Sequence, residues 1–402
     1  MPSLRLLTFT TLYPHAGAPN LGVFVENRLR HLVATGEAES RVLAPVPWVP
    51  PLGARFNPAW AAWSEAQPVE LRNNLAVHHP RYPALPKVGM NVAPWLLYAA
   101  SARALARLLR AGHRFDLIDA HYAYPDGVAA TWLGRRFGLP VVITVRGSDV
   151  TEYPDYAVPR RLLRRAFGAA DAVITVSAGL RDAVVALGVP GEKVTVLRNG
   201  VDLRAFQPAP DRAAARAGLG LDGPTLLSVG HLIPRKGHEL VVEVLADLPG
   251  WRLLVVGSGP ERAALEAMAA RLGVADRVRL MGQVPHGELS RIYTAADALV
   301  LASSREGWAN VLLESMACGT PVVASPIPGN PEVVQERAAG VIMPERSAAG
   351  VAAGVRDLVG DPPARAATRA YAERFGWDAT SQGQLALFRR VLMSRQKPSG
   401  VA

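Results

Sequence analysis

The sequence contains one cysteine, Cys318, in 402 residues. A single thiol can form neither a disulfide framework nor a cysteine-based zinc site, and its apolar surroundings favour a packing role in a reducing compartment. The chain also lacks any run of about 18 apolar residues, the length that a membrane-spanning helix needs. Its first residues alternate apolar and polar side chains as a strand does, unlike a secretory signal. These absences predict a cytoplasmic protein that is either soluble or peripheral to a membrane.

Lysine is scarce, because forty of the 44 basic residues are arginines. The net charge of +10 is uneven: residues 1–208 carry 23 basic and 15 acidic side chains, and residues 209–402 carry 21 and 19. A basic first half suits nucleic acid, anionic lipid or an anionic substrate. No zinc knuckle, helix-turn-helix or aromatic-interleaved basic strand favours nucleic acid. We therefore expect no nucleic-acid partner, and an anionic membrane or substrate instead.

Strand-like apolar runs alternate with helical stretches along the whole chain, which is typical of α/β folds with parallel sheets. We expect first-half strands at 5–10, 40–44, 117–120, 141–145, 172–176 and 194–197, and second-half strands at 225–229, 251–256, 278–281, 298–302, 321–324 and 340–343. The stretch Phe206–Asp211 has the composition of a linker. The pattern predicts two doubly wound domains that face each other across a cleft, at 1–208 and 209–376. A final helix, at 377–402, would return to the first domain through Leu385, Phe388 and Leu392.

Two segments of the first half suggest surface roles. Residues 46–95 are rich in proline and carry four tryptophans, so we expect a long loop that is either functional or simply packed. Arg160, Arg161, Arg164 and Arg165 form a helical stripe beside apolar residues. This stripe predicts either contact with an anionic membrane or an ordinary solvated face.

The most informative stretch runs from Ser303 to Ser325 and carries Glu306 and Glu314. A buried strand ends at about Ala302, a loop follows, and a helix is expected from Asn310 to Cys318. Loops and helix N-termini at the carboxyl ends of parallel strands bind ligands, and anions in particular. Two carboxylates there suit a ligand with an anionic group and many hydroxyls, such as a nucleotide-sugar. Two unremarkable surface glutamates are the alternative.

A second candidate anion site follows the first strand of the second half. The loop from Gly230 to Gly237 contains Arg235 and Lys236, one of only four lysines. In an arginine-rich chain this lysine suggests a need for a compact ammonium group. The same pair also fits a solvated turn before a helix.

Polar residues follow strands of the first half in the same manner. A backbone could approach a diphosphate at Gly22, and His121 is either a polar or acid/base group or a structural histidine. Arg146, Asp149 and Asn199 are further candidates for the rim of a cleft, although Asn199-Gly200 is above all a turn signal.

Two familiar sites are excluded. Arg262 occupies the third glycine position of a dinucleotide fingerprint that begins at Gly257, so a nicotinamide cofactor is not expected. No Asp-x-Asp triplet is present, so we expect no metal and no cofactor, with cations and helix N-termini neutralising a diphosphate.

Taken together, these segments resemble the family-four retaining glycosyltransferases, whose two-Rossmann-domain architecture is called GT-B. The resemblance covers nearly the whole chain and is carried by Glu306–Glu314, by Arg235-Lys236-Gly237, by Asn199–Asp202, by Gly22 and by Phe375–Trp377.

The resemblance implies a role for each matching residue. Glu314 would hold the ribose, Glu306 the transferred sugar, and Gly230, His231 and Lys236 the diphosphate. The backbone from Gly307 to Val311, including Asn310, would lie against sugar and phosphate, and Val284 would contact the base. His121 would contact the donor sugar and orient the acceptor. His231 departs from the family, which usually has arginine there, and three alternatives stay open: Arg235 takes over, a protonated His231 serves, or Gly22 and Lys236 suffice. Trp308 also replaces a smaller aromatic residue.

The implied function is a metal-independent retaining transfer of a hexose from a UDP-, GDP- or ADP-sugar to a saccharide or lipid-linked acceptor of the cell envelope. The protein would work in the cytoplasm, at the inner face of the membrane if it is peripheral. Two alternatives remain open: a sugar-nucleotide epimerase on the same scaffold, and an inactive sugar-nucleotide-binding protein.

Overall fold

The computed structural model describes residues 3–50, 58–83 and 89–396. The chain forms two compact units, residues 1–199 with 378–402 (unit 1) and residues 200–377 (unit 2). The boundary therefore precedes the predicted linker. Val201 N–H already donates to Phe375 O at 2.9 Å within unit 2, and Phe206 is buried against the ring of Tyr293. Phe206–Asp211 therefore lies inside unit 2, a few residues after its first residue, Gly200.

Unit 1 is built on an eight-stranded sheet whose strands are parallel except for the edge pair β4 and β5. The order is β10-β9-β8-β7-β1-β2-β5-β4. The strands are β1 (Leu4–Phe9), β2 (Ala38–Leu43), β4 (Val69–Arg72), β5 (Leu75–His78), β7 (Leu117–His121), β8 (Val141–Val145), β9 (Ala172–Thr175) and β10 (Val194–Val196). Buried apolar runs make the central strands β1, β7, β8 and β9, because a parallel sheet is covered on both faces.

Helices cover both faces of this sheet. α1 (Val23–Ala34) and α16 (Trp377–Gln396) share one core with it, in which Leu29 and Phe388 meet Val142. The predicted return of the last helix to the first domain is therefore confirmed for the described residues. α4 (Val128–Phe137) covers the opposite face with α3 (Gly89–Arg110) and α6 (Ala157–Ala169) packed against it. The shorter helices are α5 (Ser148–Thr151) and α7 (Ala178–Ala186).

The prediction of a long loop at 46–95 is wrong for the described residues of this segment. β3 (Val46–Trp48) pairs with β6 (Arg81–Pro83). Between these two strands in the sequence lie α2 (Pro58–Glu65) and then β4 and β5, which extend the main sheet. Short strands around proline give no long apolar run, which is why the sequence did not reveal them. Residues 51–57 and 84–88 of this segment lie outside the described residues.

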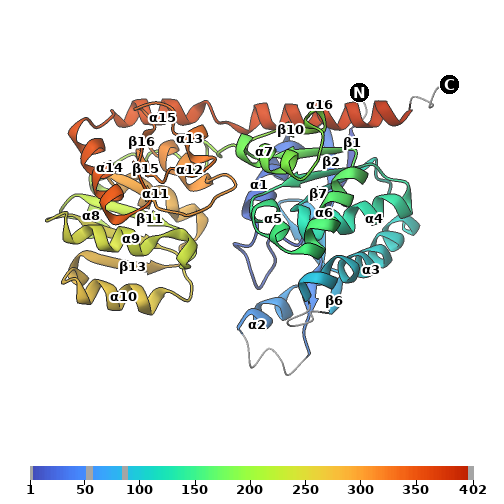
Figure 1. Cartoon of the computed structure of the whole chain (residues 1–402), viewed down its shortest axis with the longest axis horizontal. Helices are drawn as coiled ribbons and strands as arrows, with labels where there is room; N and C mark the ends of the chain where they lie inside the picture. The colour runs from blue at the N-terminus through green and yellow to red at the C-terminus, as the bar shows by residue number, and fades with distance from the viewer. Residues whose placement is uncertain (1–2, 51–57, 84–88, 397–402) are drawn as a thin grey trace. The chain divides into compact units, whose positions relative to one another are not determined.

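Unit 2 contains a six-stranded parallel sheet in the order β13-β12-β11-β14-β15-β16. Its strands are β11 (Thr225–Val229), β12 (Arg252–Val256), β13 (Val278–Gly282), β14 (Ala298–Leu301), β15 (Val322–Ala324) and β16 (Gly340–Ile342). The helices are α8 (Arg212–Ala217), α9 (His238–Glu243), α10 (Arg262–Arg271), α11 (Leu289–Ala295), α12 (Asn310–Ala317), α13 (Asn330–Val333), α14 (Ala348–Gly360) and α15 (Arg365–Glu373). Both units have the doubly wound arrangement that the alternating pattern predicts (Figure 1).

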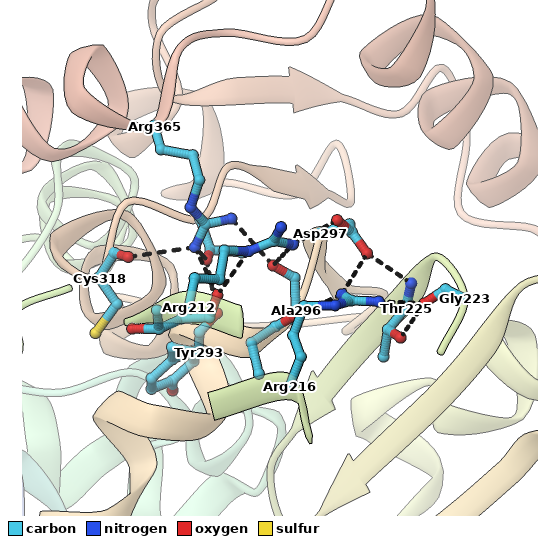
Figure 2. A network of polar contacts seen from close by, with 12 residues as sticks. Arg212, Arg216, Gly223, Thr225, Tyr293, Ala296, Asp297, Cys318 and Arg365 are labelled. Atoms are coloured by element: carbon cyan, nitrogen blue, oxygen red, sulfur yellow. Dashed lines mark hydrogen bonds and ion pairs between the residues drawn. The ribbon is translucent and has the colours of Figure 1, made fainter. Parts of the chain in front are cut away.

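Three arginines lock the amino end of β14 in unit 2 (Figure 2). Arg212 and Arg216 both pair with Asp297, at 2.6 and 3.1 Å, and Arg365 donates to the carbonyls of Ala296 and Thr294. These carbonyls end α11, where a helix presents partial negative charge. The arginines therefore fix α8, α11 and α15 at the sheet edge opposite the strand ends that carry the candidate site.

Among the described residues, no helix is long and apolar enough to cross a membrane.

Candidate functional site

The strand order of unit 2 reverses between β11 and β14, and a doubly wound sheet binds its ligands beside such a reversal. The loop after β11 carries Lys236 and the loop after β14 carries Glu306. Gly237 has φ 71°, and a Cβ there would lie 2.1 Å from Ala302 O, so only glycine allows the two loops to touch. Ser304 N–H then donates to Arg235 O at 2.8 Å. The two predicted loops are thus interlocked at the carboxyl edge of the sheet.

Lys236 and Glu306 form an ion pair at the centre of this site. Lys236 Nζ lies 2.6 Å from Glu306 Oε1, and Ser303 Oγ donates to the same oxygen at 2.7 Å. Their side chains are 17% and 11% exposed, so solvent screens the pair only in part. Arg235 lies 3.7 Å from Glu306 Oε2 and donates to Arg305 O. The cation predicted for a diphosphate and the carboxylate predicted for a sugar are therefore in direct contact.

Glu314 lies on α12 and is held by a residue that the sequence did not single out. The hydroxyl of Tyr293, on α11, donates to Glu314 Oε2 at 2.8 Å. Burial, followed by the nearby Glu314 charge, raises the pKa of Tyr293 well above its usual value. The hydroxyl therefore remains a donor at every physiological pH and orients the carboxylate. Nothing in the residues around Tyr293 distinguishes it from an ordinary core aromatic, so only the fold reveals this contact.

The N-terminus of α12 brings the remaining residues of the Glu306 segment to the same edge. Ala309 caps this helix and provides no side-chain acceptor. Gly307 lies in the loop just before it, and Asn310 and Val311 form its first turn. First-turn amides attract an anion, so this helix end complements Lys236. Unit 2 thus brings Lys236, Glu306 and the start of α12 to the carboxyl edge of its sheet, and the binding of a ligand there stays a prediction.

The surrounding loops complete the edge. Gly257 has φ 146°, and a Cβ there would lie 1.8 Å from Gly230 O. The glycines after β12 thus serve close packing of two loops, in keeping with the exclusion of a dinucleotide fingerprint. His231 is exposed on the loop after β11, and Val284 is half-buried just after β13. Their predicted ligand contacts stay predictions.

Unit 1 has its own reversal of strand order between β1 and β7. Gly22 begins α1 with φ 64°, and a Cβ there would lie 2.2 Å from Leu12 O. The loop after β1 is tied to the loop after β7, because Thr11 donates both its N–H and its hydroxyl to Asp126. Burial raises the pKa of Asp126 to about 8. Gly22 is thus required by the backbone of its turn, whatever else it does.

His121 is 1% exposed at the end of β7. Arg146 donates to His121 Nδ1 at 2.7 Å, and His121 Nε2 lies 3.2 Å from Asp119 Oδ2. Burial lowers the pKa of His121 to about 4, with Asp119 opposing the effect and Arg146 adding to it. The ring is therefore neutral at pH 7, and both nitrogens have protein partners. This arrangement holds the ring in place between two charged partners, and its predicted catalytic role and contact with the donor sugar stay predictions.

The other first-half candidates are buried beneath the rim. Asp149 accepts the backbone N–H groups of Ala123, Arg146 and Gly147, so it fixes a turn and is not a rim ligand as predicted. Asn199 is 4% exposed and accepts from Arg146 at 3.0 Å. Both are corrections with one cause: these polar groups satisfy buried backbone and guanidinium donors.

Arg28 and Gln384 complete this network and were missed from the sequence. Arg28 is 1% exposed and donates to Gln384 Oε1 at 2.9 Å, while Gln384 Nε2 donates to Asp119 Oδ2 at 3.0 Å. Burial lowers the pKa of Arg28 to about 10. α16 therefore connects α1 to the strand that carries His121. A polar residue on the apolar face of the last helix is the one signal that could have indicated it.

Two family models match the chain. Residues 60–205 match Glycosyltransferase Family 4, and residues 211–375 match Glycosyl transferases group 1. The chain is 31% identical over 376 residues to a D-inositol 3-phosphate glycosyltransferase of Kineococcus radiotolerans, covering 84% of this chain and 86% of the relative.

Solved structures agree in fold. A sucrose-phosphate synthase from Thermosynechococcus elongatus has a TM-score of 0.78 at 22% identity, covering 98% of this chain and 100% of the other. Anabaena HepE in complex with UDP and glucose has a TM-score of 0.73 at 20% identity, covering 96% and 100%. At these identities the likeness establishes the GT-B fold and leaves the substrate open.

Proposed function

The chain belongs to glycosyltransferase family 4 and is a glycosyltransferase of the GT-B type, and from that membership we propose that it transfers a hexose from a nucleotide-diphospho-sugar with retention of anomeric configuration. One observation carries the proposal. Lys236 contacts Glu306 where the strand order of unit 2 reverses, and the loop of Glu306 leads into α12, which carries Glu314. That arrangement offers positive charge for a diphosphate and carboxylates for sugar hydroxyls.

We assign the roles as follows. Lys236, assisted by Arg235 and the α12 amides, binds the diphosphate and stabilises the charge that it acquires as the sugar departs. Glu314, oriented by Tyr293, binds the ribose, and Glu306 binds the transferred sugar. The acceptor hydroxyl forms a bond to the anomeric carbon on the face that the leaving phosphate vacates, as the bond from this carbon to the phosphate breaks, and its proton passes to the departing diphosphate. Because Lys236 already contacts Glu306 at 2.6 Å, one ammonium group would be shared by the phosphate and the carboxylate that holds the sugar.

Titration calorimetry tests the donor site by comparing the affinities of UDP, GDP and ADP with those of the corresponding nucleosides. Replacing Lys236 by alanine should weaken nucleoside diphosphate binding on the order of tenfold to a hundredfold, the value of a hydrogen bond to a charged group. Nucleoside affinity should change much less. Glu314→Gln should weaken both ligands, because the ribose is common to them. Lys193→Ala, in unit 1, is the matched control.

Equal losses of nucleoside and diphosphate in the Lys236 variant would contradict the diphosphate assignment. The known complex of HepE with UDP and glucose makes UDP-glucose the first donor to try. Incubation of this donor without acceptor separates the alternatives. An epimerase converts the sugar, an inactive binder releases no UDP, and a transferase releases UDP slowly by hydrolysis.

The acceptor has two candidates. We propose as the first a saccharide or lipid-linked saccharide of the cell envelope, because unit 1 is strongly basic. The enzyme itself would work in the cytoplasm. The similarity to inositol phosphate glycosyltransferases favours a phosphorylated cyclitol as the second. Product formation with each acceptor decides between them. An NMR spectrum of the product gives the anomeric configuration, and full activity in EDTA would support the expected independence of metal.

A further inference from the structure

Three helices of unit 1 form a surface with positive charge only. α3, α4 and α6 pack against one another and contain no Asp or Glu (Figure 1). All of their arginines are exposed. Six of them line grooves between these helices and define the arginine face: Arg103, Arg107, Arg110, Arg135, Arg136 and Arg165. Of these six, the sequence indicated Arg165 alone. We propose that the arginine face binds the anionic surface of a lipid bilayer.

The charge of this face is not neutralised within the protein. In residues 3–50, 58–83 and 89–396, none of these arginines has a carboxylate within salt-bridge distance. Their hydrogen bonds go to neutral groups, such as Arg136 to the Tyr98 hydroxyl at 3.4 Å and Arg110 to Ala106 O. Several arginines elsewhere in unit 1 are paired, as Arg395 is with Asp171 and Arg389 with Glu37. Among the described residues, no such pair reduces the charge of the arginine face.

Aromatic side chains stand beside the arginines. Trp95 is 49% exposed and its ring lies 4.9 Å from that of Trp132, onto which Tyr98 packs edge-on. With Arg135 and Arg136 these rings line one groove between α3 and α4. A second groove between the same helices is lined by Tyr98 and the arginines of α3. Tryptophan and tyrosine beside arginine are typical of surfaces that lie at the level of lipid headgroups.

Nucleic acid fits this face less well than a bilayer does. Bases stack on free aromatic faces in a groove that follows the backbone, whereas here Trp95 and Tyr98 pack against Trp132. The charge is spread over three neighbouring helices, which suits a broad anionic surface. Each cation near such a surface strengthens the attraction to anionic lipid, so several arginines on one face act together.

The test needs no catalysis and does not rest on the proposed reaction. The full-length protein is sedimented with vesicles of phosphatidylcholine, with and without phosphatidylglycerol, at low and high salt. We expect binding only to the anionic vesicles, with release at high salt. A triple variant of α3, Arg103→Gln with Arg107→Gln and Arg110→Gln, should reduce the partition coefficient on the order of a hundredfold.

A matched triple variant in unit 2 controls for net charge. Arg271, Arg291 and Arg356 are exposed and outside the arginine face, so their replacement by glutamine should leave binding nearly unchanged. Equal losses in the two triple variants would overturn the proposal, because total charge would then suffice. So would a wild-type protein that stays in the supernatant with anionic vesicles at low salt.

A second readout reports the orientation. Lipids brominated near the headgroup end of the acyl chain should quench tryptophan emission, and Trp95→Tyr should remove part of that quenching. Trp48→Tyr is the control, because Trp48 is 53% exposed but lies on β3, outside the face. Loss of quenching in the Trp48 variant alone would overturn the assignment. The face would be assigned to nucleic acid instead if the wild type bound a duplex oligonucleotide and no vesicles, and if the α3 triple variant lost the binding of the oligonucleotide.

Discussion

Burial controls the charge of His121, since the cost of desolvating the ring exceeds the attraction of Asp119. Arg146 on the other nitrogen adds to this effect, and the buried Arg28 contributes further positive charge. A neutral ring can accept from Arg146 and donate to Asp119 at the same time. The residue therefore acts as a fixed connector between two charges, and its protonation would break the hydrogen bond from Arg146.

We predict that His121 makes the protein sensitive to acid. Its pKa is about 4 in the folded state and 6.5 ordinarily, so below pH 6.5 the unfolded chain takes up a proton that the native state excludes. The stability that this neutral ring contributes is complete above pH 6.5 and is lost as the pH falls toward 4, up to roughly 3 kcal/mol. Urea unfolding of the wild type and of His121→Gln, from pH 7.5 to 4.5, measures it.

Glutamine can keep both hydrogen bonds but has no proton to gain, so the variant should lose less stability over this range. Asp126 titrates in the same interval in the opposite direction, because its pKa is raised to about 8. The difference between wild type and variant cancels that contribution. His113→Gln, at a half-buried position outside the network, is the control. Parallel curves for wild type and His121→Gln would contradict the prediction.

The sequence predicted the types of residue at the site better than their partners. The loop positions of Lys236 and Glu306 followed from strand ends, but the 2.6 Å contact between residues 70 apart did not. Arg28 and Gln384 are 356 residues apart and meet only because α16 returns to the sheet. Asp149 and Asn199 were misread for the same reason: a polar residue after a strand can face a ligand or a buried donor, and the choice depends on packing.

At the scale of elements, the last helix determines whether unit 1 has a complete core. Leu385, Phe388 and Val391 of α16 are buried among residues of α1 and of the sheet. This part of the chain is separated from the rest of unit 1 by the whole of unit 2. Unit 1 therefore acquires its full core only after the chain has been completed.

Most strands of the two sheets were predicted to within a residue or two, because each is a buried apolar run between turn signals. β3, β4, β5 and β6 were missed, since none of them is a continuous buried apolar run. The antiparallel pairing of β4 with β5 at the sheet edge leaves no local mark either. The apolar pattern of the sequence thus predicts strands that have a buried apolar run of their own. It does not predict short strands that form only by pairing with a neighbouring strand.

Phe388→Ala should destabilise unit 1 by about 3–5 kcal/mol, because Phe388 is fully buried and the cavity would be lined by several elements. Arg390→Ala, exposed on the same helix, should change stability by less than about 0.5 kcal/mol. Chemical unfolding followed by a probe in unit 1 measures both. A cost below about 1 kcal/mol for Phe388→Ala would mean that α16 is not part of the core that determines unit 1 stability.

At the scale of the whole molecule, the two units have separate apolar cores. One core joins α1 and α16 to the eight-stranded sheet, and the other joins β11, β12 and β14 to the helices of unit 2. Chains with two such cores need not unfold in one step. We therefore expect two calorimetric transitions, one for each unit. Because the candidate donor site lies in unit 2, a donor ligand should change the two transition temperatures by different amounts.

We predict that UDP, or whichever nucleoside diphosphate binds, raises mainly the transition of unit 2. Lys236, Glu306 and Glu314 all belong to that unit, and ligand at 100 times its dissociation constant adds about 2.7 kcal/mol to the unit that binds it. For a unit of this size the shift is roughly 5–10 °C. Phe388→Ala identifies the other transition by lowering it, and Glu314→Gln should reduce the ligand shift. If the ligand moved the transition that Phe388→Ala lowers and left the other in place, the donor site would have to be sought in unit 1.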